Sequence, residues 1–177
     1  MVHSNSLAHT FRIWMILMTA TALTACTGYA VSINDNPVYN PPTLFTDFRL
    51  PDAALHDCVQ QTIEDRQVTE ATQLTQLNCS SAGIESLAGL STFTALRAIS
   101  LNDNPLEDIA ELRTLSRLEV LLLENNQIRS AEPLLSLLRL KEVDLRGNTA
   151  LECRDARQLA DNAEGEVRLP EHCTEAS

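Results

Sequence analysis

The sequence contains little glycine and almost no lysine. Only five of its 177 residues are glycine, and Lys141 is the only lysine. So little glycine argues against a disordered chain, and an apolar content of 44% is ordinary for a globular protein. With a net charge of −11 and scattered arginines, the chain is a poor candidate for binding the phosphate backbone of nucleic acids. We therefore expect one globular domain that does not bind nucleic acid.

Motifs of catalysis and metal binding are also missing. The sequence has no glycine-rich phosphate loop, and the serine pair at residues 80–81 has no histidine or lysine positioned to activate it. Two histidines, His56 and His172, lie outside the N-terminal segment 1–25, and neither belongs to a set with metal-ligand spacing. His172 beside Cys173 is better interpreted as an exposed tail residue than as a ligand. We therefore expect no enzyme activity, cofactor, metal or small-molecule substrate.

Residues 74–151 repeat with a period of 22. Apolar residues recur in three columns and asparagine in a fourth, with Ala82 in place of asparagine in the first row. The columns are Leu74, Leu96, Leu118 and Leu140; Leu77, Ile99, Leu121 and Val143; Cys79, Leu101, Leu123 and Leu145; and Asn104, Asn126 and Asn148. A fixed period of about 20–29 residues with the pattern L-x-x-L-x-L-x-x-N-x-L is the signature of the leucine-rich repeat.

Each row predicts a short strand followed by a tighter return segment. The run L-x-x-L-x-L alternates apolar and polar residues, as in a half-buried strand. The asparagine amide can satisfy backbone groups of the next turn that have no ladder partner. Apolar residues then recur at every third position, which fits 3₁₀ or short helical turns; the alternative, a pair of amphipathic helices, agrees less well with this spacing. Because no row can bury its own face, the rows should stack around one core.

The N-terminal segment 1–25 is interpreted as an export signal. Arg12 precedes the apolar run 13–22, which is too short to span a bilayer. The end of the segment, Leu23-Thr24-Ala25-Cys26, resembles the lipobox of bacterial lipoproteins, in which the signal is cut before a cysteine that then carries acyl chains. Two or three such chains anchor a protein stably to a membrane. An ordinary cleaved signal with a chance cysteine is the alternative.

The lipobox resemblance implies a lipid anchor at Cys26 and a location in the cell envelope. Thr27, rather than aspartate, follows that cysteine, which in Gram-negative bacteria favours the outer membrane, on its periplasmic or exposed side. Cleavage removes Arg12 and no other charged residue, so the remaining chain has 24 acidic and 12 basic residues and a net charge of −12. Residues 26–44 contain three prolines and no sustained period, and are expected to be a tether.

Residues 45–73 differ from the repeats and are expected to cap the first row. Pro51 suits the first turn of a helix, and Asp52 complements its positive end. One apolar helix face is then marked by Leu55, by Cys58 or Val59, and by Thr62 or Ile63. The pattern Leu50-Pro51-Asp52-x-x-Leu55-x-x-Cys58-Val59, followed by Val68-Thr69 and Leu74-Thr75-x-Leu77, resembles the caps of internalin-like and other bacterial 22-residue repeat proteins. Over residues 45–151 this resemblance implies an α/β fold, a short right-handed solenoid with a parallel concave sheet, used for protein–protein contact.

Residues 152–177 are expected to form a second cap, closed by a disulfide. Residues 154–163 have helical character, Gly165 suits the stop, and Val167 and Leu169 alternate with charged residues like a short edge strand. Where the last row enters this cap, a strict period places Ala150 in the core, whereas a slip of one residue places Leu151 there.

Four cysteines remain after Cys26 is assigned to the lipid, and in an oxidising compartment they allow three pairings. Cys79 stands in an inward column of the first row, and Cys58 lies on the apolar face of the expected cap helix. Cys153 lies near the core of the last row, and Cys173 ends the tail that returns over it. The pairs Cys58–Cys79 and Cys153–Cys173 would each fasten one cap, whereas the other pairings would join opposite ends of the stack. Loops of about 20 residues make each bridge worth roughly 3 kcal/mol.

Strand positions that alternate with the core columns should face outward on the concave side. They are Gln76, Asn78 and Ser80; Ala98, Ser100 and Asn102; Val120, Leu122 and Glu124; and Glu142, Asp144 and Arg146. Val120 and Leu122 are two apolar residues on an otherwise polar face, and tolerated surface hydrophobes are the alternative to a binding role. We expect a protein to bind here, with Val120 and Leu122 as its anchors. The surrounding binding residues are expected to be Ser100, Asn102, Glu124, Asp144 and Arg146.

The sequence thus predicts an outer-membrane lipoprotein whose repeat face binds another protein. Four strands at about 4.8 Å spacing make a sheet only about 15 Å wide, which suits one small patch on a partner. A structural or assembly role in the envelope, without a discrete high-affinity ligand, is the alternative.

Overall fold

The computed structural model describes residues 31–33, 36–39 and 42–174, and the chain divides into two compact units. The first unit comprises residues 1–42 and the second residues 43–177. The predicted export signal at residues 1–25, the predicted acylation site Cys26 and the last three residues lie outside the described part of the chain.

The first unit contains a small hairpin. Strands β1 (Val31–Ile33) and β2 (Asn36–Tyr39) pair antiparallel, with Ile33 opposite Asn36. The hairpin lies within residues 26–44, which are predicted from their prolines to be a tether. The β-branched residues Val31 and Ile33 favour an extended backbone, and Pro37 lies in a two-stranded pair that has edges on both sides.

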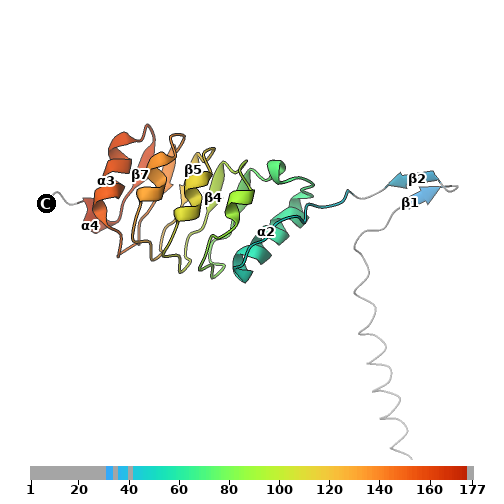
Figure 1. Ribbon diagram of the computed structural model, residues 1–177, viewed down its shortest axis with the longest axis horizontal. Coiled ribbons are helices and arrows are strands. Elements are labelled where there is room, and N and C mark those ends of the chain that lie inside the picture. The colour runs from blue at the N-terminus through green and yellow to red at the C-terminus, as the bar shows by residue number, and fades with distance from the viewer. Residues whose placement is uncertain (1–30, 34–35, 40–41, 175–177) are drawn as a thin grey trace, which may run out of the picture. The chain divides into compact units, whose positions relative to one another are not determined.

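The second unit is a stack of short rows, each with one strand and one return segment (Figure 1). One parallel sheet contains, in order, β3 (Gln76–Asn78), β4 (Ala98–Ser100), β5 (Val120–Leu122), β6 (Glu142–Asp144) and β7 (Glu166–Arg168). The 3₁₀ helices are η1 (Ala71–Gln73), η2 (Leu90–Thr92), η3 (Ala110–Thr114) and η4 (Glu132–Ser136). The leucine-rich-repeat solenoid that the columns predict is therefore confirmed, with a fifth strand added by the C-terminal cap.

Strand pairing follows the sequence period. Leu77 pairs with Ile99, Ile99 with Leu121, and Leu121 with Val143, each partner standing one repeat further along the chain. The last step, from Val143 to Val167, is longer than the repeat because this row contains a helix. The paired residues are all buried except Val167, so the predicted inward register is confirmed. The face of the sheet turned away from this core is called the concave face below.

A ladder of buried asparagines joins the rows. The Asn126 amide donates to the carbonyl of Leu123 in its own row and to that of Leu101 in the preceding row, both at 3.0 Å. Its Oδ1 accepts the backbone N–H of Leu106, also in the preceding row. Asn104 and Asn148 repeat this arrangement. Each asparagine thus completes the turn of the row before it, and the first row, which has no repeat before it, has the exposed Ala82 instead.

Helix α2 (Ala53–Arg66) covers the first row. Asp52 is its N-cap, because Oδ1 accepts the N–H of Leu55 at 2.9 Å. The second carboxylate oxygen accepts the N–H groups of Glu85 and Ser86, which belong to the first repeat. Asp52 therefore both starts the cap helix and fastens it to the stack. The buried helix face consists of Leu55, Val59 and Ile63.

An aromatic cluster fills the space between the N-terminal cap and the first row. Phe93 occupies the column that holds Leu115 and Leu137 in later rows, and it is fully buried. Its ring lies edge-on to Phe45 and Phe48, at centroid distances of 6.1 and 5.6 Å. The larger side chain suits the first row, because its neighbour is an irregular segment rather than another repeat.

The C-terminal cap consists of α3 (Cys153–Asn162), β7 and α4 (Glu171–Thr174). Leu151 is buried and Ala150 is exposed, so the last row slips by one residue as it enters the cap. Among the described residues, every member of the buried hydrophobic core lies between residues 50 and 173. We therefore treat residues 43–177 as a unit able to fold by itself.

Candidate interaction surface

The concave face has a shallow hollow over its three N-terminal strands. It measures about 370 Å³ and lies over β3, β4 and β5, with Arg66 of α2 at one end. Val120 and Leu122 line it and are half-buried, whereas Leu121 between them is fully buried. The structure therefore places the predicted anchor pair on the outward side of the sheet, in a depression that a partner's side chain can enter.

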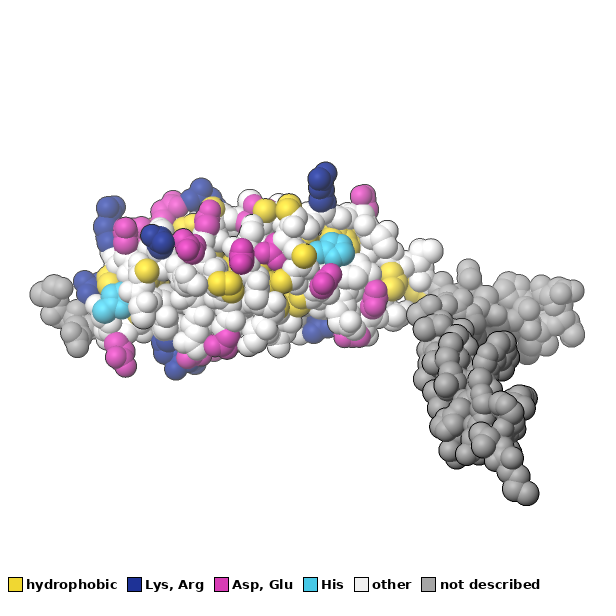
Figure 2. Space-filling view, turned by 90° about the horizontal axis from the view of Figure 1, so that it is seen from below, with side chains coloured by type: hydrophobic (Ala, Val, Ile, Leu, Met, Phe, Trp, Pro, Cys, Tyr) yellow, Lys and Arg dark blue, Asp and Glu magenta, His cyan; other side chains and the backbone are white. Residues whose placement is uncertain are grey.

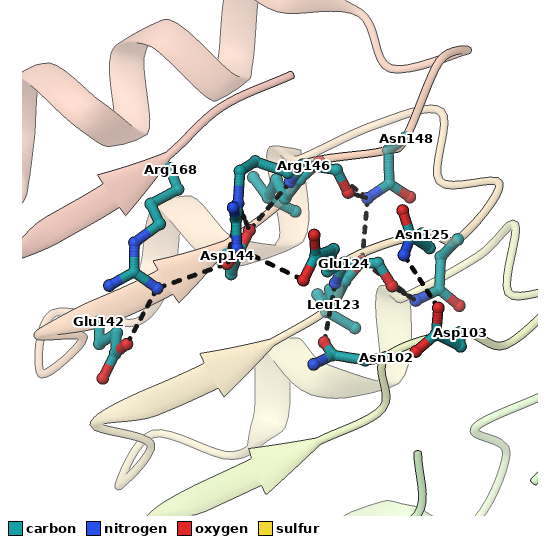
Figure 3. A network of polar contacts seen from close by, with 12 residues as sticks. Asn102, Asp103, Leu123, Glu124, Asn125, Glu142, Asp144, Arg146, Asn148 and Arg168 are labelled. Carbon is teal, nitrogen blue, oxygen red and sulfur yellow. Dashed lines mark hydrogen bonds and ion pairs between the residues drawn. The ribbon is translucent and has the colours of Figure 1, made fainter. Parts of the chain in front are cut away.

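Polar residues beside the hollow are held by hydrogen bonds within the face. The Ser100 hydroxyl lies 2.8 Å from that of Ser80, one row earlier. Asn102 Oδ1 accepts the backbone N–H of Glu124 at 2.9 Å (Figure 3). These contacts run between rows, so they fix the polar side chains in place before a partner arrives.

Asp144 differs most from the sequence prediction. It was expected among the accessible binding residues, but its side chain is only 4% exposed. Arg146 covers it, with Nη2 2.6 Å and Nε 3.0 Å from its two oxygens, and Arg168 Nη1 lies 3.4 Å away (Figure 3). The physical reason is the fifth strand, which places Arg168 beside Asp144 in register. Asp144 thus organises the two arginines, which present their other nitrogens to the surface.

A charged cluster therefore borders the hollow on the side of the C-terminal cap. Arg146 Nη2 lies 3.3 Å from Glu124, and Arg168 Nη1 lies 3.2 Å from Glu142. Arg168 was missed as a site residue, although the apolar–charged alternation of residues 166–169 is the signal that could have extended the outward columns to it.

The pKa shifts in this cluster agree with its geometry. Burial by itself would raise the pKa of Asp144. Hydrogen bonds from Arg146 and Arg168 have the opposite and larger effect, so the pKa lies below its ordinary value of 3.8. The same contacts, above all the hydrogen bond to Asp144, raise the pKa of Arg146. Asp144 and Arg146 are therefore both ionised at neutral pH.

A second set of charges lines the edge where the strands begin. Arg97, Glu119 and Lys141 occupy the same position in successive repeats, and Glu119 lies 3.0 Å from Arg97 and 2.6 Å from Lys141. The hydrogen bond from Lys141, followed by its charge, lowers the pKa of Glu119. On one side of the molecule acidic and basic groups are likewise interspersed, with hydrophobic side chains in small separate patches (Figure 2). The hollow on the concave face is thus an apolar site between two rows of ion pairs.

Both predicted disulfides are present. Cys58 in α2 is bonded to Cys79 in the first row, and Cys153 at the start of α3 is bonded to Cys173 in α4. The first bridge joins the N-terminal cap helix to the first row, and the second closes the C-terminal cap.

One group of three side chains within the described residues has metal-like proximity, namely Cys153, His172 and Cys173. Its two sulfurs are joined in the disulfide, so they are not thiolate ligands. His172 Nε2 lies 3.0 Å from the carbonyl oxygen of Leu151. The group is therefore explained by closure of the cap. Within the described residues, no helix is both long and apolar enough to cross a bilayer.

Comparison with known proteins identifies structural neighbours among the internalins. An internalin (inlF) of Listeria monocytogenes superposes with a TM-score of 0.61, at 25% identity, over 69% of this chain and 37% of its own. Internalin C2 of the same species superposes with a TM-score of 0.58, at 23% identity, over 68% of this chain and 54% of its own. The chain thus spans about a third to a half of the length of these neighbours. No protein-family model matches the sequence, and neither does any curated protein. The chain is an α/β leucine-rich-repeat solenoid, an architecture that indicates a protein-interaction domain.

Proposed function

We propose that this protein is anchored by lipid in the cell envelope and binds a protein partner on its concave face. The observation that carries the binding site is the apolar pair Val120 and Leu122 in a hollow bordered by two rows of ion pairs. Apolar anchors that a partner can desolvate, surrounded by charged groups, are typical of the residues that dominate interface energies. The charges at Glu124 and Arg146 would then select the partner through complementary groups at the rim.

The proposal includes no catalytic role. Within the described residues, the carboxylates with lowered pKa are Asp52, Glu111, Glu119 and Asp144. Each of them accepts hydrogen bonds from backbone N–H groups, a hydroxyl, or a paired arginine or lysine. Such shifts belong to structural contacts rather than to an acid–base pair in a cleft.

The binding site is tested by capture from the envelope. Residues 43–177 are immobilised, exposed to a detergent-solubilised envelope fraction, and compared with a Leu122→Arg variant. Because Leu122 points away from the core, the variant should melt like the wild type and lose the captured protein. Loss of one buried apolar anchor is worth about 2 kcal/mol or more, or roughly 30-fold in affinity.

The matched control is Ser116→Arg, which adds the same charge at an exposed position on the return segment. This control should capture the partner normally. Equal capture by wild type and Leu122→Arg would refute the site, and capture of no protein by either would favour the structural or assembly role instead.

The lipid anchor has its own test. Replacing Cys26 with serine in the full chain should abolish acylation, so that the protein leaves the detergent phase on partitioning. Unchanged membrane retention of this variant would contradict the anchor without bearing on the concave face.

A further inference from the structure

We propose that two copies of the chain associate through a surface of leucines and charged residues next to the C-terminal cap. The surface consists of Leu135, Leu138, Arg139 and Glu164 and is called the Leu138 surface below. It lies on the return side of the third row and the adjoining end of α3, away from the residues that line the hollow of the concave face.

The third row departs from the other rows at two positions, the half-buried Leu135 and the exposed Leu138. The position of Leu135 is held by Ser91 and Arg113 in earlier rows, and that of Leu138 by Thr94 and Ser116. Leu138 is 92% exposed, and among the described residues it is the one large hydrophobic side chain so exposed. Leu135 packs against the core with part of its side chain, whereas Leu138 makes no contribution to it. An exposed leucine in a column of polar residues suggests a partner.

A hollow of about 570 Å³ lies beside Leu138. One wall is the segment from η4 to β6, which includes Leu135 and Arg139, and the other is the end of α3, which includes Leu159 and Glu164. The two walls meet where Glu166 N donates to the Lys141 carbonyl at 2.7 Å. The surface therefore has a projecting leucine beside a hollow of about 570 Å³, which is lined partly by leucines and partly by charged side chains.

The charges of the two walls are of opposite sign. Arg139 lies on one wall and Glu164 on the other, and both are exposed and form no ion pair within the described residues. The other two charges of the hollow, Glu119 and Lys141, are already paired with each other at 2.6 Å. The unpaired arginine and glutamate are thus available to a partner that offers the same two charges in the opposite order.

A second copy of this chain fits such a surface. In a two-fold contact the same patch is used twice, so that each residue meets its complement on the other copy. Leu138 of each copy then enters the hollow of the other, and Arg139 of each faces Glu164 of the other. A bilayer with anionic head groups is a poorer match, because Glu164 would oppose it.

Self-association is tested by sedimentation equilibrium of residues 43–177 over a range of concentrations. The wild type should show a monomer–dimer equilibrium, and Leu138→Arg should raise its dissociation constant more than tenfold. The matched control Ser116→Arg, at the same column position one row earlier, should leave the constant unchanged. A wild type that stays monomeric up to millimolar concentration, or an equally tight Leu138→Arg dimer, would overturn the proposal.

A charge exchange distinguishes the two-fold contact from any other apolar association. Arg139→Glu and Glu164→Arg should each weaken the dimer, and the double variant should restore it, because both contacts are then re-formed with reversed signs. If the two substitutions together weaken the dimer by the sum of their separate losses of association free energy, the two-fold arrangement is overturned. Binding of the monomeric wild type to anionic vesicles in a manner that needs Leu138 would assign the surface to lipid and also overturn it. Each result is independent of capture at the concave face, so this proposal and the proposed function fail separately.

Discussion

Removing single members of the asparagine ladder should destabilise the protein by different amounts. In the middle of the ladder, the Leu101 carbonyl accepts from both Asn104 and Asn126, and the Leu123 carbonyl from both Asn126 and Asn148. After Asn126→Ala each carbonyl keeps one partner, and one buried group, the N–H of Leu106, loses its acceptor. A buried polar group without a partner costs about 1–3 kcal/mol, so we expect a loss of about 2 kcal/mol.

Asn104→Ala should cost more because it stands at the end of the ladder. Its amide is the one side-chain donor in the described structure to the Cys79 carbonyl, since the first row has Ala82 where later rows have asparagine. The substitution therefore leaves two buried groups unpaired, this carbonyl and the N–H of Ile84. We expect a loss of about 4 kcal/mol, twice that of Asn126→Ala.

Urea and thermal unfolding followed by circular dichroism, with disulfides intact, measure the difference. At about 4 °C per kcal/mol for a domain of this size, the melting temperature should fall by about 8 °C for Asn126→Ala and about 16 °C for Asn104→Ala. The control is Gln127→Ala, an exposed amide next to Asn126, which should leave the melting temperature unchanged. Equal losses at Asn104 and Asn126 would refute the argument that shared carbonyls limit the cost.

Three further predictions concern the core, the N-cap and the first bridge. Leu121→Ala should lower the free energy of unfolding by roughly 2–5 kcal/mol in urea titrations, because it leaves a cavity, whereas Leu122→Arg should not. Burial raises the pKa of Asp52, but hydrogen bonds from backbone N–H groups lower it to below 3.8. Its contribution is therefore present above the unfolded pKa and lost as pH falls through the folded one, so the deficit of Asp52→Ala, about 1–2 kcal/mol at neutral pH, should vanish in acid melts. Peptide mapping of unreduced protein should recover Cys58 linked to Cys79, and recovery of Cys58 linked to another cysteine would contradict the cap structure.

The repeat pattern predicts the core almost completely. The side chains in a column such as that of Leu121 all point inward. Strand alternation and the fixed repeat period determine every inward position once one is known. The same reasoning predicts the asparagine contacts and the two bridges, since both depend on which residues point into the stack. Outward positions such as Val120 and Leu122 follow from the same register.

Sequence reasoning fails where contacts leave the repeat. The burial of Asp144 depends on Arg168, which follows a helix and is out of step with the repeat period, so no column connects them. The Leu138 surface depends likewise on the end of α3 facing the third row. Strands β1 and β2 lie outside the repeats, where no period predicts them, although local β-branched residues favour strands. In each case the missing information is a contact between segments that share no period.

The asparagine ladder also limits which insertions the sequence can accept. Each amide bonds one row backward, and the N-terminal cap is fastened to the first row through Asp52 and Cys58. A duplication of one complete repeat within the stack would therefore recreate every inter-row bond and disturb neither cap. An insertion of any other length would shift an asparagine out of line with the turn it serves. Gene duplication can thus lengthen the concave face in steps of one strand, whereas small insertions are confined to the loops between strand and return segment.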